Sequence, residues 1–221
     1  MPSHLSAAER EALARAAASV RWWPAALALL VIGAAYALVS DRLTVGPPWL
    51  LLTVLAPTLI GVRLLRWLGM FQARRLVALG MLGLATVAVG SSAVFLVGAL
   101  LRGRTQAGNL LLDAALLWVS NVLTFALWYW ETDGGGPAHR HLGPDCPSDF
   151  VFPQKVAGGP EAERWAPEFL DYVFLAFNTS TAFSPTDTMV LARRAKVLMM
   201  VQSVISLVTI AVLAARAINT L

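Results

Sequence analysis

The residues best suited to chemistry stand close together near the carboxyl end of the chain, where hydroxyl-bearing side chains precede a carboxylate. Hydroxyl oxygens can replace part of the water shell of a small cation, and a ring of carboxylates at a pore mouth favours cations. The stretch around Pro185 is therefore expected beside a protein-lined cavity or pore, because irregular backbone is not tolerated against lipid. The candidate filter-like residues are Thr179, Thr181, Ala182, Phe183, Ser184, Pro185, Thr186 and Asp187.

A second, mostly polar group follows in the last apolar segment and recurs in steps of four, three, four and three residues. Side chains at this spacing share one face of a helix. The group consists of Gln202, Ser206, Thr209, Leu213 and Arg216. Such a stripe suits a helix that lines a water-filled axis, where hydroxyls and an amide substitute for hydration. It equally suits hydrogen bonding between helices in a dry bundle, and the sequence leaves both interpretations open.

A third set of polar residues interrupts the fourth apolar segment, where Asp113, Asn121 and Thr124 fall on one helical face. An acid inside a membrane helix is a functional hypothesis by default, because its burial is expensive. Asp113 lies only about one turn from the start of the segment, however. A role in an ion pathway, an interfacial acid and a partner for Arg102 or Arg104 are therefore all compatible with the sequence.

The stretch of residues 131–166 holds side chains that bind zinc in other proteins, namely His139, His141, Asp145, Cys146 and Asp149. Structural zinc sites usually show two closely spaced ligand pairs, and none occurs here. No nucleophile and base stand at a recognisable spacing either. We therefore expect no metal, no cofactor, no catalytic residue and no enzymatic activity. The stretch of residues 150–153 is expected to rest on the membrane surface.

The elements that must position these residues follow from composition. Hydrophobic residues make up 57% of the chain and charged residues 14%, and the mean hydropathy is +0.66, which exceeds what a soluble core requires. Five apolar runs are long enough to span a bilayer. They cover residues 22–40, 48–65, 76–101, 108–130 and 190–218. The prediction is an all-α membrane protein with five transmembrane helices and one re-entrant half-helix.

The half-helix is predicted for residues 168–181, between Pro167 and Pro185. Fourteen residues of helix span about 21 Å, which is too short for a hydrocarbon core of about 30 Å. We expect this segment to dip into the membrane and return beside protein or water, because irregular backbone is not tolerated against lipid. The chain then divides into a surface segment (1–21), a four-helix region (22–130), an extramembrane loop (131–166) and a pore-like unit (167–221).

Charge predicts the orientation. Most of the 17 Lys and Arg residues fall on the side of the amino terminus when the five runs are crossed in turn. The positive-inside rule then places the amino terminus in the cytoplasm and the carboxyl terminus outside. The net charge of +4 is explained by arginines at helix ends facing anionic headgroups. We therefore expect the lipid bilayer, and no nucleic acid, among the partners.

From Asp171 onward the chain resembles the pore region of tetrameric potassium channels over about 50 residues. Residues 171–177 resemble the pore helix, residues 179–187 stand where those channels carry T-x-T-T-V-G-Y-G-D, and residues 191–193 precede the inner helix as in bacterial two-span channels. The resemblance implies a homotetramer in which four half-helices surround one axis that passes small cations. Ionotropic glutamate receptors show the inverted orientation, with the half-helix entering from the cytoplasm.

The departures from that pattern are informative. Both filter glycines are replaced, by Ser184 and Thr186, and the aromatic residue between them by Pro185. A potassium filter needs the positive φ angles that glycine allows and proline forbids. We therefore expect a wider or shorter constriction lined by hydroxyls. The alternative is a non-conducting structural or regulatory protein that keeps a channel-derived fold, with Phe183 plugging the axis.

The whole chain also resembles an uncharacterised bacterial family of predicted membrane proteins. That family has four spans, an aromatic-rich loop, a D-Y/F-x-Y/F-x-x-F segment and a last helix, and here the segment begins at Asp171. The resemblance implies a multi-pass protein of the bacterial inner membrane and leaves its activity open.

Overall fold

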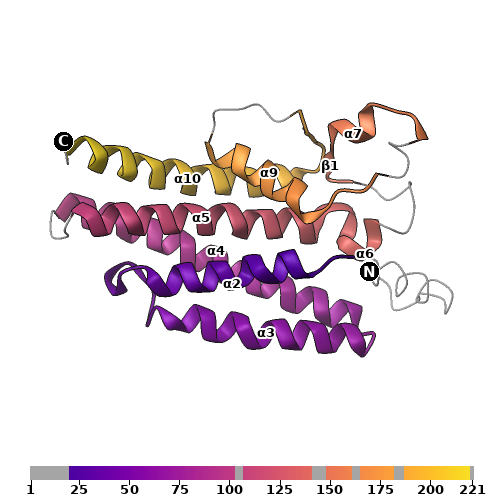
Figure 1. Ribbon diagram of the computed structural model, residues 1–221, viewed down its shortest axis with the longest axis horizontal. Helices are drawn as coiled ribbons and strands as arrows, with labels where there is room; N and C mark the ends of the chain where they lie inside the picture. The colour runs from indigo at the N-terminus through magenta and orange to yellow at the C-terminus, as the bar shows by residue number, and fades with distance from the viewer. Residues whose placement is uncertain (1–19, 103–106, 141–147, 161–164, 182–186, 220–221) are drawn as a thin grey trace.

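The computed structural model describes residues 20–102, 107–140, 148–160, 165–181 and 187–219. Five long helices lie side by side along the long axis of the molecule (Figure 1). They are α2 (Trp23–Leu38), α3 (Trp49–Trp67), α4 (Phe71–Arg102), α5 (Ala107–Thr132) and α10 (Arg193–Asn219). A sixth helix, α9 (Phe169–Thr181), is about half as long as α10. The predicted all-α class is confirmed.

Three of the described helical stretches are long and apolar enough to cross a membrane. They are Gln72–Arg102, Asn109–Gly135 and Arg193–Ile218, with mean hydropathies of 2.2, 1.9 and 2.4. Helices α2 and α3 are apolar but shorter, and the 16 residues of α2 span about 24 Å. The protein is therefore a helical bundle compatible with membrane insertion, and the count of five spans stays a prediction.

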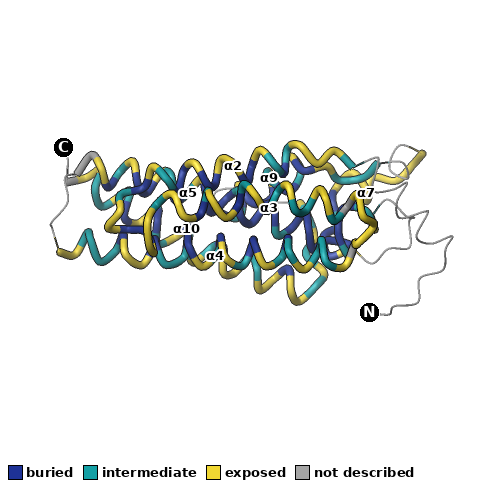
Figure 2. The backbone as a smooth tube through the Cα atoms, turned by 90° about the horizontal axis from the view of Figure 1, so that it is seen from below, coloured by how far each residue is buried: buried dark blue, intermediate teal, exposed yellow. Residues whose placement is uncertain are grey.

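Helix α5 is the centre of the bundle because it contacts α2, α4, α9 and α10. Its side chains at Leu110, Ala114, Leu117, Phe125 and Tyr129 are buried, and their spacing of three, four and eight residues makes one continuous inner face. The outer faces of α4 and α10 instead expose apolar side chains (Figure 2). An apolar outer face suits contact with lipid.

Helices α2 and α3 approach closely at one glycine. A Cβ atom at Gly33 would stand 2.8 Å from Cδ1 of Leu52 and 3.2 Å from its Cα. Only a residue without a side chain permits the two backbones to come this near. The short loop between the helices contains η1 (Asp41–Leu43) and is held by Tyr36, whose hydroxyl accepts the N–H of Val45 at 3.1 Å.

The described residues between α5 and α9 form four short elements. These are η2 (Asp133–Gly135), α6 (Pro137–Arg140), β1 (Phe150–Val151) and α7 (Pro153–Val156). Strand β1 pairs antiparallel with β2 (Met189–Val190), which precedes α10.

Residues 150–153 were expected to rest on the membrane surface, and two of their side chains pack inside the protein instead. Phe150 and Phe152 are buried, with Phe150 against the ring of Tyr129 at 5.2 Å and Phe152 against that of Tyr172 at 5.5 Å. Aromatic edge-to-face pairs inside the bundle stabilise this position.

Candidate functional site between helices α5, α9 and α10

Helix α9 runs alongside α10, and both begin at the same end of the bundle (Figure 1). With 13 residues against 27, α9 reaches about 20 Å along a helix of about 40 Å. By β2 the chain is back at the end where α9 began, because β2 pairs with β1 and Phe150 of β1 lies against Tyr172 in the first turn of α9. The excursion between Phe169 and Met189 therefore starts and finishes at one end of the bundle.

The start of α9 is fixed by its own sequence. Pro167 disfavours helix before it, and the carboxylate of Asp171 accepts the N–H of Glu168 at 2.7 Å. This contact reaches back from the third helical residue to the cap position, as in a capping box. Tyr172, Leu175 and Ala176 form the buried face of α9, while other apolar side chains of the helix face outward.

Gln202 joins the three helices of the site. Its carboxamide oxygen accepts the hydroxyl proton of Tyr129 on α5. Its Nε2 donates to the carbonyl of Ala176 and to Oγ of Ser180, both on α9 and both at 2.7 Å. The backbone carbonyl of Gln202 accepts Nδ2 of Asn121 at 3.2 Å. Because the residue has no exposed surface, this polar contact lies wholly inside the bundle.

Ser206 extends the same contact one turn further along α10. Its hydroxyl donates to the carbonyl of Ser180 at 2.7 Å and accepts Nε1 of Trp118 at 3.1 Å. The indole of Trp118 meets the ring of Phe177 edge-on at 5.6 Å. We call the hydrogen-bonded set of Tyr129, Gln202, Ser180, Ser206 and Trp118 the polar seam. It holds the half-length helix against its two full-length neighbours.

The stripe on α10 is thus turned into the chain's own bundle. Gln202, Ser206 and Thr209 are buried, and Thr209 donates to the carbonyl of Ile205 at 2.8 Å. Leu213 packs against a second apolar cluster and Arg216 is half-buried. Of the two interpretations that the sequence left open, hydrogen bonding between helices describes the contacts of Gln202 and Ser206. An axis between copies of the chain would be lined by other residues.

Three of the eight filter-like residues fall within the described part of the chain. The hydroxyls of Thr179 and Thr181 donate to the carbonyls of Leu175 at 2.8 Å and Asn178 at 3.3 Å, within α9. Asp187 is exposed where the chain returns towards β2. The other five candidates, Ala182 to Thr186, lie outside the described residues.

Asp113 ties α5 to the end of α2. Its carboxylate accepts the backbone N–H of Ser40 at 3.0 Å and the hydroxyl of Ser40 at 2.7 Å. Asn121 and Thr124 are buried on α5. Within the described residues, Oδ1 of Asn121, Oγ1 of Thr124 and Nδ2 of Asn178 have no hydrogen-bond partner. Buried polar atoms of this kind are usually satisfied by ordered water.

Asp133, at the end of α5, organises the return of the chain. Its carboxylate accepts the N–H of Asp149 at 2.6 Å, the hydroxyl of Ser148 at 3.0 Å and the hydroxyl of Tyr172 at 2.5 Å. Arg140 lies beside it, donating to the carbonyls of Trp130 and Asp133 at 2.7 and 2.9 Å. One buried carboxylate thereby fixes the loop to the first turn of α9.

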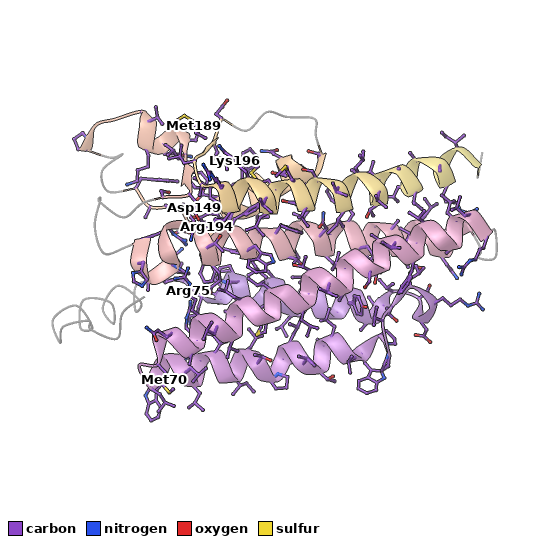
Figure 3. All side chains as sticks on the ribbon, turned by 180° about the vertical axis from the view of Figure 1, so that it is seen from behind. Met70, Arg75, Asp149, Met189, Arg194 and Lys196 are labelled. Atoms are coloured by element: carbon purple, nitrogen blue, oxygen red, sulfur yellow. The ribbon has the colours of Figure 1, made fainter. Side chains whose placement is uncertain are left out.

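Asp149 and Arg194 complete this end of the bundle (Figure 3). Nε and Nη2 of Arg194 each stand 2.8 Å from a different oxygen of the carboxylate, which is a bidentate pair. The carbonyl of Asp149 also accepts the N–H of Leu191 at 2.9 Å. Asp149 was predicted only as a candidate metal ligand, and its carboxylate is engaged by Arg194 instead.

No cluster of three metal-ligating side chains occurs among the described residues. Of the loop candidates, His141, Asp145 and Cys146 lie outside those residues. His139 lies on α6, where burial, and then the charge of Arg75, lowers the pKa of its imidazole. The arrangement fits a packed loop that closes the end of the bundle.

Comparison of the chain with protein-family models, with curated proteins and with solved structures finds no match.

Proposed function

We propose that this is a pore-type protein of the bacterial inner membrane, in which copies of the α9 segment surround an axis that passes small cations. The observation that carries the proposal is the course of the chain between α5 and α10. A half-length helix enters alongside α10, and the chain is back at its starting end before α10 begins. Backbone that turns back within a membrane is tolerated only where protein buries it or water reaches it. A half-helix held in this way is therefore expected beside a water-filled conduit.

The carboxyl end of α9 supplies the chemistry. The last carbonyls of a helix carry a partial negative charge, and at this end stand the hydroxyl-bearing residues Thr179 and Thr181. Asp187 adds a carboxylate on the return path. Partial charges, hydroxyl oxygens and a carboxylate together attract a cation and replace part of its water shell.

Four copies are the natural assembly under this proposal. One chain supplies one half-helix and cannot encircle an axis alone, and the resemblance to potassium-channel pores suggests four. The lining then comes from residues 179–187, with the apolar outer face of α10 below it, where Val204, Leu207 and Ala211 are exposed. In this assembly the polar seam holds α9 against its neighbouring helices and does not line the conduit.

The second candidate is a non-conducting structural or regulatory membrane protein with the same fold. The observation that favours it is the outer face of α10. The exposed residues on this face are all apolar, namely Met200, Val204, Leu207 and Ala211. Such a face also suits dry packing against another helix or against lipid.

Proteoliposomes distinguish the two functions. Under the pore proposal, purified protein passes monovalent cations above the background of empty vesicles, and Asp187→Asn lowers the flux several-fold because the mouth loses its charge. Asp41→Asn is the matched control, since this exposed acid lies in η1. If neither cations nor protons cross above background and Asp187→Asn changes nothing, the non-conducting function replaces the pore.

A further inference from the structure

A cleft of about 1000 Å³ opens between α2, α3, α4 and α5, away from the polar seam. It lies at the end of the bundle where α2 begins and α5 ends, since its lining includes Trp22, Trp23 and Glu131. Pockets that bind small molecules commonly enclose about 300–1,000 Å³. The walls are apolar and include Leu29, Leu59, Ala78, Met81 and Leu82.

The rim of the cleft is positively charged. Three arginines, Arg21, Arg63 and Arg74, line it together with the single acid Glu131. Arg74 is paired with Glu131 at 2.9 Å. Arg63 lies over the indole of Trp22, with its guanidinium carbon 4.6 Å from the ring centroid, which is a cation–π contact. Arg21 is exposed, so the rim carries an excess of positive charge.

The amino terminus of α2 opens on the same rim. Trp22 stands at its cap position, and no side chain of the described residues caps the first turn. Pro24 in this turn has no N–H, and the remaining N–H groups, together with the partial positive charge of the helix amino terminus, favour a bound anion. Two independent features, the arginines and the uncapped helix, therefore direct positive charge at one place.

The tryptophans of the cleft indicate its position along the membrane normal. Trp22, Trp23 and Trp67 line the cleft and are exposed, and exposed tryptophans gather at the boundary between headgroups and hydrocarbon. The arginines then lie at headgroup level and the apolar walls at acyl-chain level. A free inorganic anion has no apolar part to contact the walls. A zwitterionic lipid has no net charge to be attracted by the arginines.

We propose that this cleft binds one anionic phospholipid. The phosphate lies between Arg21, Arg63 and the amino terminus of α2, and an acyl chain follows the apolar wall along Leu29 and Met81. The site is independent of the pore proposal, because none of its lining residues belongs to the polar seam.

Native mass spectrometry of the delipidated full chain tests the site, with phosphatidylglycerol and phosphatidylcholine of identical acyl chains as probes. We expect one phosphatidylglycerol to bind about tenfold more tightly than phosphatidylcholine. Arg63→Gln should weaken phosphatidylglycerol binding about fivefold and Arg21→Gln/Arg63→Gln about twentyfold. Arg42→Gln removes the same charge at the other end of α2 and should change binding less than about twofold.

A second pair of variants tests the apolar part without changing charge. Ala26 lines the cleft, so Ala26→Leu should occupy acyl-chain space and weaken phosphatidylglycerol binding several-fold. Ala211→Leu, on the exposed face of α10, should leave it unchanged.

Equal binding of the two lipids, or equal effects of Arg63→Gln and Arg42→Gln, would overturn the proposal. Displacement of the lipid by millimolar inorganic phosphate would identify a free-anion site and also overturn it. If Ala26→Leu binds as tightly as Ala211→Leu, the lipid lies outside the cleft and the proposal is wrong.

Discussion

Gln202 is the residue whose loss should loosen the half-helix most. Gln202→Leu removes the acceptor of Tyr129 and the donors to Ala176 and Ser180, so that each of these buried groups loses one hydrogen bond. Each hydrogen bond lost in an apolar interior is expensive, so we expect the free energy of unfolding to fall by about 2 kcal/mol. Thermal unfolding in detergent, followed by circular dichroism, measures the change.

Ser203→Ala is the matched control on the neighbouring position of α10. The hydroxyl of Ser203 reaches the carbonyl of Thr179 only at 3.5 Å, so its loss should change the unfolding free energy by less than about 0.5 kcal/mol. Equal stabilities of Gln202→Leu and Ser203→Ala would show that the polar seam does not hold α9.

Local spacing predicted which polar residues share a face, and it could not predict what that face meets. The periodicity of Gln202, Ser206 and Thr209 is a property of one helix. The partners of Ser206 are Trp118 and Ser180, which stand 88 and 26 residues away in the sequence. No short-range pattern encodes such pairs. The sequence alone therefore could not distinguish hydrogen bonding between helices from a stripe that lines water.

The pair of Asp149 and Arg194 joins two elements, β1 with its loop and the first turn of α10. Arg194→Gln leaves a buried carboxylate without its bidentate partner. Because the Arg194 side chain is about half exposed, solvent screens part of the interaction, and we expect a loss of about 1 to 2 kcal/mol in the free energy of unfolding. Thermal unfolding of the purified protein measures it.

The neighbouring Arg193 provides the control for this pair. Arg193→Gln removes the same charge from an exposed side chain and should leave stability within about 0.5 kcal/mol. In a double-mutant cycle, Asp149→Asn and Arg194→Gln should together cost less than the sum of the single changes. Strict additivity would mean that the two side chains do not stabilise the return of the chain.

Sequence was most informative at the level of elements. The apolar runs matched the helices because a span must be apolar along its length; residues 168–181 were expected as a short helix, and α9 covers Phe169–Thr181. Helix α4 begins before its expected start, at Phe71, since charged residues at a helix end lower hydropathy without breaking the helix. The burial of Phe150 was missed because its ring partners Tyr129 and Tyr172 are distant in the sequence.

Charge is distributed unevenly over the whole molecule. Arg75, Arg194 and Lys196 lie at one end of the bundle (Figure 3), and Arg42 and Arg102 belong to elements that meet at the other. The positive-inside rule therefore predicts that the loop with Cys146, the only cysteine, is cytoplasmic. A membrane-impermeant maleimide should label Cys146 in inverted vesicles and not in intact cells with a permeabilised outer membrane. The reverse pattern would invert the orientation.

The measurement that bears most directly on the half-crossing is the side from which Asp187→Cys is labelled in a Cys146→Ser background. If the chain enters along α9 and returns, residue 187 lies on the same side as residue 146, while Leu221→Cys, beyond the end of α10, lies on the opposite side. We predict that an impermeant maleimide reaches Asp187→Cys from the side that labels native Cys146. Labelling of Asp187→Cys only from the side opposite native Cys146, with Leu221→Cys labelled from the side of Cys146, would make α9 part of a full crossing and contradict the half-crossing.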